Sequence, residues 1–184
     1  MIKEHIYDAA HSGDVKEVSA WLTAHPEKLD AEISDGFTLL HVASAFGQVQ
    51  LVSYLLDRNA KVNVNATNLT RATPLHLATL YINDETAARI VDRLIANGAE
   101  LNAPQNGGQT ALHHAVARGS KPVVETLIHA GADPMLKDNQ GRCAMDLSTG
   151  DSAMPRYAPK CTRVLEVRCA RDLETAARLL LALR

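Results

Sequence analysis

The stretch Thr73-Pro74-Leu75-His76 decides the fold of this chain, because it recurs in altered form at a near-constant interval. Thr38-Leu39-Leu40-His41 lies 35 residues before it, and Thr110-Ala111-Leu112-His113 lies 37 residues after it. An alanine follows each histidine by two residues, and two apolar pairs and a turn come next, in the same order each time. A tandem repeat of roughly 33 residues indicates a stacked array, whose units bury their apolar faces on one another.

The residue types within one unit predict two helices joined by a tight turn. Thr73 suits a helix start, and Pro74 fits the first turn, where its missing N–H group costs nothing. The second segment carries apolar pairs four residues apart, as in Leu51-Val52 and Leu55-Leu56, and this spacing makes one apolar helix face. Gly47 stands where the chain turns from the first helix to the second.

These recurring positions resemble the ankyrin repeat. The resemblance implies an all-α solenoid of about five helix-turn-helix units with finger loops between them and degenerate caps at both ends. We expect the stack to occupy residues 1–150 and residues 151–184 to form a C-terminal capping segment. The unit boundaries are expected at about 5–34, 35–67, 68–105, 106–138 and 139–150 onward.

The C-terminal segment has two interpretations. Residues 172–183 are amphipathic, with Asp172 as an N-cap, and would cover the apolar end of the last unit. Alternatively, Leu165, Cys169 and Leu173 are similar to the Leu-x-x-x-Cys-x-x-x-Leu element by which suppressor-of-cytokine-signalling box proteins hold elongin. Val164 departs from that pattern, and no Pro-containing cullin element follows.

The composition argues against a membrane-spanning, secreted or disulfide-rich protein. The hydrophobic content of 46% is ordinary for a soluble chain, and no apolar run approaches the ~20 residues that span a bilayer. The first eight residues lack the apolar core of a signal peptide, and three cysteines cannot form a disulfide framework. We therefore expect a cytoplasmic protein that does not associate with membranes.

The net charge of −2 conceals an asymmetry along the chain. Residues 1–155 carry 12 Lys and Arg against 18 Asp and Glu, whereas residues 156–184 carry 7 against 3. A uniformly basic surface for direct nucleic-acid binding is therefore absent from the sequence. The acidic N-terminal part is either a solvated cap or a field that attracts a basic partner.

The repeated histidines favour a structural role over chemistry. His41, His76 and His113 occur once per unit and have no companion carboxylates at metal-ligand spacing. The resemblance implies that their imidazoles form hydrogen bonds across the loops of adjacent units. We find no catalytic motif in the sequence and expect neither an enzyme nor a cofactor or metal.

The third unit departs from the pattern of the others. Ala78 and Ala99 are 21 residues apart, whereas the equivalent alanines in the flanking units are 17 apart, and the four extra residues fall around 81–86. The loop before this unit is longer by two residues, and Arg71 stands where the other units have glycine. Such changes indicate either a contact surface or neutral variation in loop length.

Members of this family bind partners with finger tips and with the exposed ends of the first helices. Mapping the repeat onto this chain places nine candidate contact residues on those parts, and Phe37 and Phe46 are the only phenylalanines. The candidates are Phe37, Phe46, Leu69, Arg71, Leu80, Tyr81, Gln109, Arg118 and Arg142.

The sequence thus favours a monomeric module that binds another protein without catalysis. One alternative is an inhibitor or self-protection protein that occludes a toxin or nuclease, which fits the small size and the acidic N-terminal part. Another alternative is a substrate-recognition adaptor of a ubiquitin ligase, which rests on the Leu165–Leu173 pattern.

Overall fold

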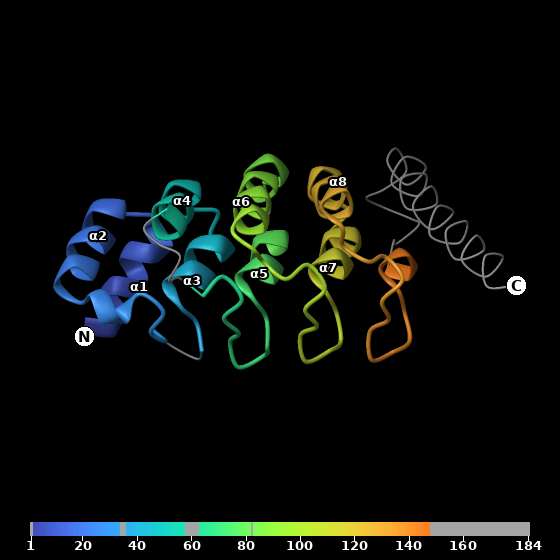
Figure 1. The fold of residues 1–184 in the computed structure, drawn as a ribbon, viewed down its shortest axis with the longest axis horizontal. Helices are drawn as coiled ribbons and strands as arrows, with labels where there is room; N and C mark the ends of the chain where they lie inside the picture. The colour runs from blue at the N-terminus through green and yellow to red at the C-terminus, as the bar shows by residue number, and fades with distance from the viewer. Residues whose placement is uncertain (1, 34–35, 58–62, 82, 148–184) are drawn as a thin grey trace, which may run out of the picture.

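The computed structural model describes residues 2–33, 36–57, 63–81 and 83–147, and it shows a row of helix pairs with loops projecting on one side (Figure 1). No strand occurs among these residues. The elements, in chain order, are α1 Ile2–Ser12, α2 Val15–Ala24, the 3-10 helix η1 Pro26–Lys28, α3 Leu39–Ala45, α4 Val49–Asp57, α5 Pro74–Leu80, α6 Asp84–Ala96, α7 Ala111–Arg118, α8 Lys121–Ala130 and the 3-10 helix η2 Ala144–Leu147.

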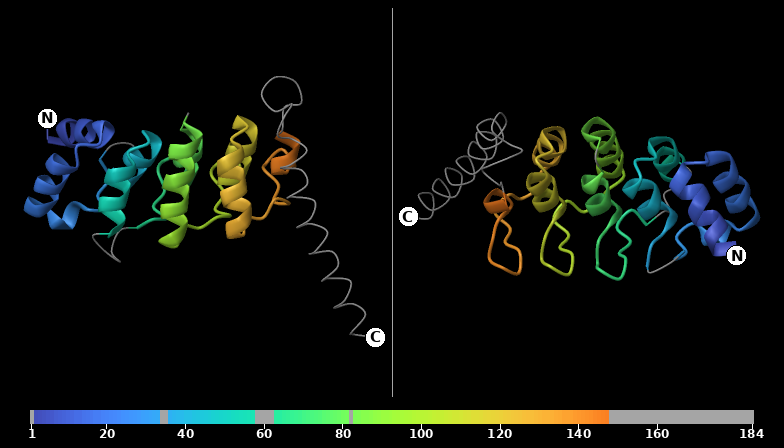
Figure 2. Two further views of the ribbon diagram at one scale, coloured as in Figure 1. Left: turned by 90° about the horizontal axis from the view of Figure 1, so that it is seen from above. Right: turned by 180° about the vertical axis from the view of Figure 1, so that it is seen from behind.

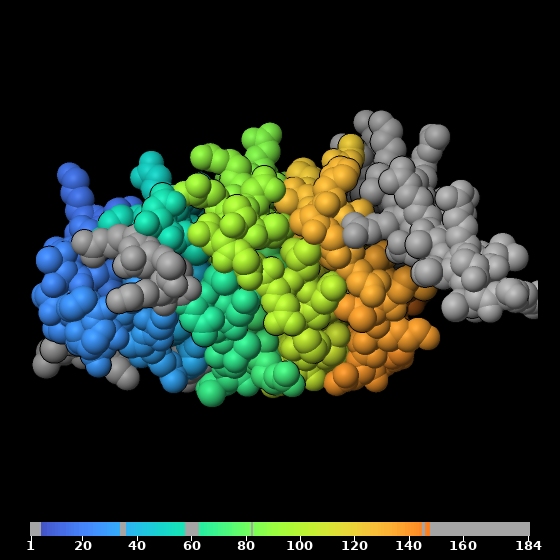
Figure 3. Space-filling model, in the orientation of Figure 1, coloured from blue at the N-terminus to red at the C-terminus, as the bar shows by residue number. Residues whose placement is uncertain are grey.

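Equivalent helices of successive units pack on one another. First helices pack on first helices, in the order α1, α3, α5 and α7, and second helices pack on second helices, in the order α4, α6 and α8 (Figures 1 and 2). The apolar pairs of the second helices are buried between neighbouring units, apart from the half-buried Ile95, and Leu55 and Leu94 have no exposed area. In the space-filling view the units follow one another as adjacent bands along the long axis (Figure 3). This arrangement confirms the all-α repeat solenoid.

Glycine makes the turn between the two helices of a unit where the sequence predicts it. Gly47 and Gly119 have φ angles of +72° and +78°, a left-handed conformation that only glycine adopts without strain. The third unit has no such glycine. There the chain leaves α5 through Tyr81 in an extended conformation, and Asn83 caps α6 by accepting a hydrogen bond from the Thr86 N–H group.

The extra residues of the third unit lengthen its second helix. Helix α6 has 13 residues, whereas α4 has 9 and α8 has 10. The insertion therefore adds about one helical turn at the start of α6, rather than an irregular loop.

The finger of the third unit keeps the length of the others. In each finger the N–H group of the first residue donates to the carbonyl four residues on, as from Asn68 to Ala72 at 3.1 Å and from Gln105 to Gln109 at 3.0 Å. Asn65 and Asn102 both lie three residues before their finger, and each bonds the next unit in the same way. The two additional residues of the loop consequently precede Asn65 and leave the length of the finger unchanged.

Several predictions concern residues outside the described ranges. They include the capping segment 151–184, the amphipathic stretch 172–183, the Leu165–Leu173 pattern and finger residues 34–35. Within the described ranges, the longest helix has 13 residues, and none is both long and apolar enough to cross a membrane.

Candidate functional site

A ladder of buried histidines fixes each finger to the helix pair before it. The backbone N–H group of Thr73 donates to His76 Nδ1 at 3.2 Å, so Nδ1 is unprotonated and the proton resides on Nε2. His76 Nε2 then donates to the Gln109 carbonyl of the next finger at 3.2 Å. His41 and His113 form the same bonds, with the carbonyls of Ala72 at 3.0 Å and Arg142 at 3.2 Å.

Two histidines of this ladder, His41 and His76, are held neutral by their surroundings. Burial lowers the pKa of His41 and of His76 below the usual value for histidine, because the charged form would lose its hydration. Among the described residues, no group of three or more His, Cys, Asp or Glu side chains is arranged to hold a metal ion. The geometry therefore assigns these imidazoles to the framework of the stack.

Two further sets of hydrogen bonds join adjacent units. At the base of the fingers, Asn65 Oδ1 accepts from the Glu100 N–H group at 2.7 Å, and Asn102 Oδ1 accepts from the Asp133 N–H group at 2.9 Å. At the finger tips, the Asn106 N–H group donates to the Thr70 carbonyl at 2.9 Å. The fingers are thus held at base, middle and tip, and a partner would meet a surface that needs little further ordering.

The ends of the first helices bring aromatic and apolar side chains together across three units. The rings of His11 and Phe46 lie 4.0 Å apart between centroids. Tyr81 lies against Gly47, so closely that a Cβ atom on this glycine would be 2.3 Å from Tyr81 Cζ. Leu80, next to Tyr81, is 50% exposed. We call these four side chains, His11, Phe46, Leu80 and Tyr81, the helix-end patch.

The exposure of the predicted aromatic contacts differs from residue to residue. Phe46 is 37% exposed, whereas Phe37 and Tyr81 are half-buried and pack against the core. The ring of Phe37 lies edge-on to the buried His41 at a centroid distance of 5.8 Å. Phe37 therefore stabilises the stack as well as presenting an edge to solvent.

Leu69 and Arg71 lie at the tip of the finger of the third unit. Leu69 is 71% exposed, the most exposed of the large apolar residues described. Arg71 has a φ angle of +60°, because it occupies the left-handed position that Gly36, Gly108 and Gly141 occupy in the other fingers. A side chain there carries a conformational cost that glycine avoids.

The other polar candidates, Gln109, Arg118 and Arg142, are engaged inside the stack. The Gln109 side chain accepts a hydrogen bond from Gln105 Nε2 at 3.3 Å. Arg118 binds Asp84, which belongs to the added turn of α6, and so links the third and fourth units. The added turn of α6 therefore contributes an ion pair to the contact between the third and fourth units.

Arg142 joins the two ends of the last finger by binding Asp138. Its Nη2 and Nε atoms bond Asp138 Oδ2 at 2.7 and 3.0 Å. These bonds lower the pKa of Asp138 to about 2, so the carboxylate stays charged at neutral pH. Whether Gln109, Arg118 and Arg142 also contact a partner stays a prediction.

The sequence alone did not identify His11 as part of the helix-end patch, and it did not identify Met135 as an exposed apolar residue outside that patch. His11 belongs to the degenerate first unit, which the mapping did not cover, although its place four residues after Tyr7 corresponds to that of Leu80 after His76. Met135 is 59% exposed. It stands three residues before its finger, the position that Asn65 and Asn102 hold in the preceding units, so a comparison of the units could have identified it.

Comparison with known proteins agrees with this geometry. The family model for ankyrin repeats in three copies matches residues 6–91 and 65–138, which together span most of the chain. The chain belongs to the ankyrin repeat family. Ankyrin repeats are protein-interaction modules and generally have no catalytic activity.

Curated relatives of this ankyrin repeat chain are much longer proteins. A probable E3 ubiquitin-protein ligase, XBOS31 of Oryza sativa subsp. japonica, is 35% identical over 128 residues, which is 69% of this chain and 28% of that protein. The B-cell lymphoma 3 protein homolog of Mus musculus is 34% identical over 110 residues, which is 60% of this chain and 23% of that protein. Rabankyrin-5 of Homo sapiens is 30% identical over 149 residues, which is 77% of this chain and 13% of that protein. The chain thus spans less than a third of the length of each of these relatives.

Proposed function

We propose that this chain binds a partner protein through the helix-end patch and the finger tips, without catalysing a reaction. The observation that carries the proposal is the series of contacts at the helix ends: Phe46 lies against His11 of the preceding unit, and Tyr81 of the following unit lies against Gly47, beside Phe46. Leu80, next to Tyr81, is half exposed. Aromatic side chains that meet across units offer a large contact area with few rotatable bonds, as binding hot spots do.

The hydrogen-bonded fingers support the part of the proposal that concerns the finger tips. Because three sets of hydrogen bonds hold the fingers, a partner loses little affinity to ordering the finger tips. Occlusion of a toxin or nuclease by this surface is one form of the proposal. The excess of carboxylates among the first 35 residues supports it, since an acidic field attracts basic partners.

The test is affinity capture from the native cell with three immobilised proteins: the unaltered chain, the double variant Phe46→Ala/Leu80→Ala, and Met135→Ala. The last is a matched control, because Met135 is exposed and apolar but lies outside the patch. We expect the unaltered chain and the control to retain the same proteins, quantified by mass spectrometry, and the double variant to lose them. Retention by the double variant would show that the contact surface lies elsewhere.

A second candidate function is that of a substrate adaptor of a ubiquitin ligase. The similarity to XBOS31, which is itself described as a probable E3 ubiquitin-protein ligase, favours it, together with the Leu165, Cys169 and Leu173 pattern. Purified chain mixed with the elongin heterodimer tests this role by size-exclusion chromatography. Co-elution that is lost in Leu165→Ala would support the role, and separate elution of the native chain would exclude it.

A further inference from the structure

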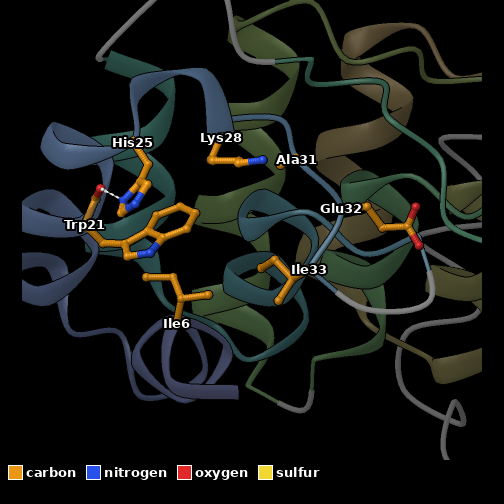
Figure 4. A pocket seen from close by; sticks show the side chains of 7 residues that line it. All are labelled: Ile6, Trp21, His25, Lys28, Ala31, Glu32 and Ile33. Atoms are coloured by element: carbon orange, nitrogen blue, oxygen red, sulfur yellow. Dashed lines mark hydrogen bonds between the residues drawn. The ribbon is translucent and has the colours of Figure 1, made fainter. Parts of the chain in front are cut away.

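A pocket of about 380 Å³ opens in the first unit, beside α1, the end of α2 and the segment that leads into the first finger (Figure 4). Its volume lies near the lower end of the range for small-molecule sites, which is about 300–1,000 Å³. Trp21, the only tryptophan of the chain, lines it. The pocket is separate from the helix-end patch, because none of the patch residues lines it.

The walls of the pocket are apolar because two positions of the repeat carry unusual residues in this unit. Trp21 stands where the later units have leucine, and Ile33 stands where the later fingers begin with Asn68, Gln105 or Asp138. Ile33 is 6% exposed and Trp21 is half-buried, so both present hydrocarbon to the cavity rather than to bulk solvent. Ile6, on α1, completes this apolar wall (Figure 4).

The mouth of the pocket carries a cation without a counter-charge. Lys28 is exposed, and it forms no ion pair within the described residues. Its side chain extends along one side of the pocket toward Ala31, while the ring of His25 stacks on Trp21 at a centroid distance of 5.1 Å (Figure 4).

Glu32 is the one acidic residue that lines the pocket, and it does not neutralise Lys28. Its Oε1 atom accepts a hydrogen bond from the Gly36 N–H group at 2.7 Å. The carboxylate points away from Trp21 and Lys28, on the other side of Ile33 (Figure 4). An apolar cavity with a free ammonium group at its mouth therefore favours a ligand that joins a hydrocarbon group to an anion.

We propose that this pocket binds a branched aliphatic carboxylate, with the hydrocarbon group against Trp21 and Ile33 and the carboxylate paired with Lys28. A branched aliphatic group next to a carboxylate is found at the carboxyl terminus of a peptide that ends in leucine or isoleucine, and also in free branched-chain carboxylic acids. Both kinds of ligand offer the pocket the same two groups, a branched hydrocarbon and a carboxylate. The proposal does not depend on partner binding at the helix-end patch.

Trp21 supplies a direct readout, because its fluorescence reports on this pocket alone. The full chain is titrated with three probes: the peptide acetyl-Gly-Gly-Leu with a free carboxylate, the same peptide as its C-terminal amide, and 4-methylpentanoate. We expect the free peptide acid to change the emission in a saturable way and the amide to bind about 5-fold more weakly, since a partly exposed ion pair is lost.

Two variants test whether the preference for the peptide acid arises from an ion pair with Lys28 or from the overall charge of the protein. In Lys28→Met, the peptide acid should bind no better than the amide, while the thermal melting temperature stays that of the native chain. In the matched control Lys16→Met, which removes an exposed lysine of α2 outside the pocket, the preference for the acid should persist. Equal binding of acid and amide by the native chain, or no change of emission with any probe up to about 10 mM, overturns the proposal.

The probes also distinguish the two sources of the ligand. A peptide acid that binds at least about 10-fold more tightly than 4-methylpentanoate identifies a peptide terminus as the ligand. Tighter binding of 4-methylpentanoate identifies a free acid, and equal affinities show that the shared branched carboxylate alone is recognised.

Discussion

His76 Nε2 lies 3.2 Å from the carbonyl oxygen of Gln109, 33 residues further along the chain, and this bond joins the third unit to the finger of the fourth. The same imidazole accepts from the Thr73 N–H group through Nδ1. One neutral ring thus satisfies two buried backbone groups in different units. A side chain that cannot do so leaves both groups without partners.

We therefore expect His76→Ala to lower the free energy of unfolding by about 1–3 kcal/mol, the cost of leaving buried polar groups unsatisfied. Urea denaturation at pH 8 measures the change. The control is His129→Ala, an exposed residue near the end of α8, which should change stability by less than about 0.5 kcal/mol. Stoichiometric zinc in the native protein that disappears in His76→Ala would contradict the framework role.

Stability should fall as the solution is acidified from pH 6.5 toward pH 4. His114 has its pKa lowered from 6.5 to about 4, first by burial and then by repulsion from His76 and His113. The His114 imidazole takes up a proton at a higher pH in the unfolded chain than in the folded chain. The contribution of neutral His114 to the free energy of unfolding is therefore complete above pH 6.5 and is lost as the pH falls through 4. We expect a loss of roughly 1–3 kcal/mol from this residue.

The variant His114→Leu isolates this contribution, since Leu77 occupies the equivalent position in the preceding unit. Urea denaturation at a series of pH values should give a shallower pH dependence for the variant than for the native chain. Identical slopes would show that His114 does not titrate differently in the folded and unfolded states.

Gly47→Ala should destabilise the chain for two separable reasons. The new Cβ atom would lie 2.3 Å from Tyr81 Cζ, and the φ angle of +72° strains any residue other than glycine. The conformational term alone costs about 1–2 kcal/mol. Pairing the change with Tyr81→Ala removes the clash but not the strain, so thermal unfolding of the two variants should separate these costs.

Gly107→Ala provides the control for Gly47→Ala, because nothing lies within 4 Å of its added Cβ atom and its φ angle is not positive. We expect its melting temperature to stay close to that of the native chain. If Gly107→Ala and Gly47→Ala lowered the melting temperature by similar amounts, the contact between residue 47 and Tyr81 would not explain the effect of Gly47→Ala.

Arg71→Gly should raise stability by up to about 1 kcal/mol, because glycine adopts the left-handed conformation at this finger tip without strain. If Arg71 contacts the partner, the same variant should bind it more weakly. Higher stability with lower affinity, measured by denaturation and isothermal titration calorimetry, is the expected pair of results. Lower stability would indicate that the arginine side chain stabilises the finger.

Phe46→Ala should weaken binding of the captured partner by about 30-fold or more, as truncation of an aromatic anchor does. Because Phe46 is 37% exposed and contacts His11, we also expect a moderate loss of stability, about 1 kcal/mol. Calorimetry and thermal unfolding of the same samples distinguish the two effects. A large loss of stability with unchanged affinity would place Phe46 in the framework only.

The amino-acid sequence determined the architecture and the structural role of the histidines. The Thr-x-x-His units and the paired apolar residues act locally, through helix caps and helix periodicity, and a repeat brings like elements of successive units together. For this reason the recurrence of Thr73 and His76 along the chain, together with the resemblance that it carries, was enough to predict their structural role.

The tertiary structure decided which candidate side chains are exposed. Phe37 and Phe46 are both candidate contacts in the sequence, but Phe37 packs edge-on against the buried His41, whereas Phe46 lies against the exposed His11 and is itself 37% exposed. Arg118 faces Asp84 because an added helical turn carries that carboxylate to it. The pocket beside Trp21 likewise depends on where α1 lies relative to the first finger. Exposure and pairing depend on neighbours that can lie a whole repeat away, and the residues of a single unit do not encode them.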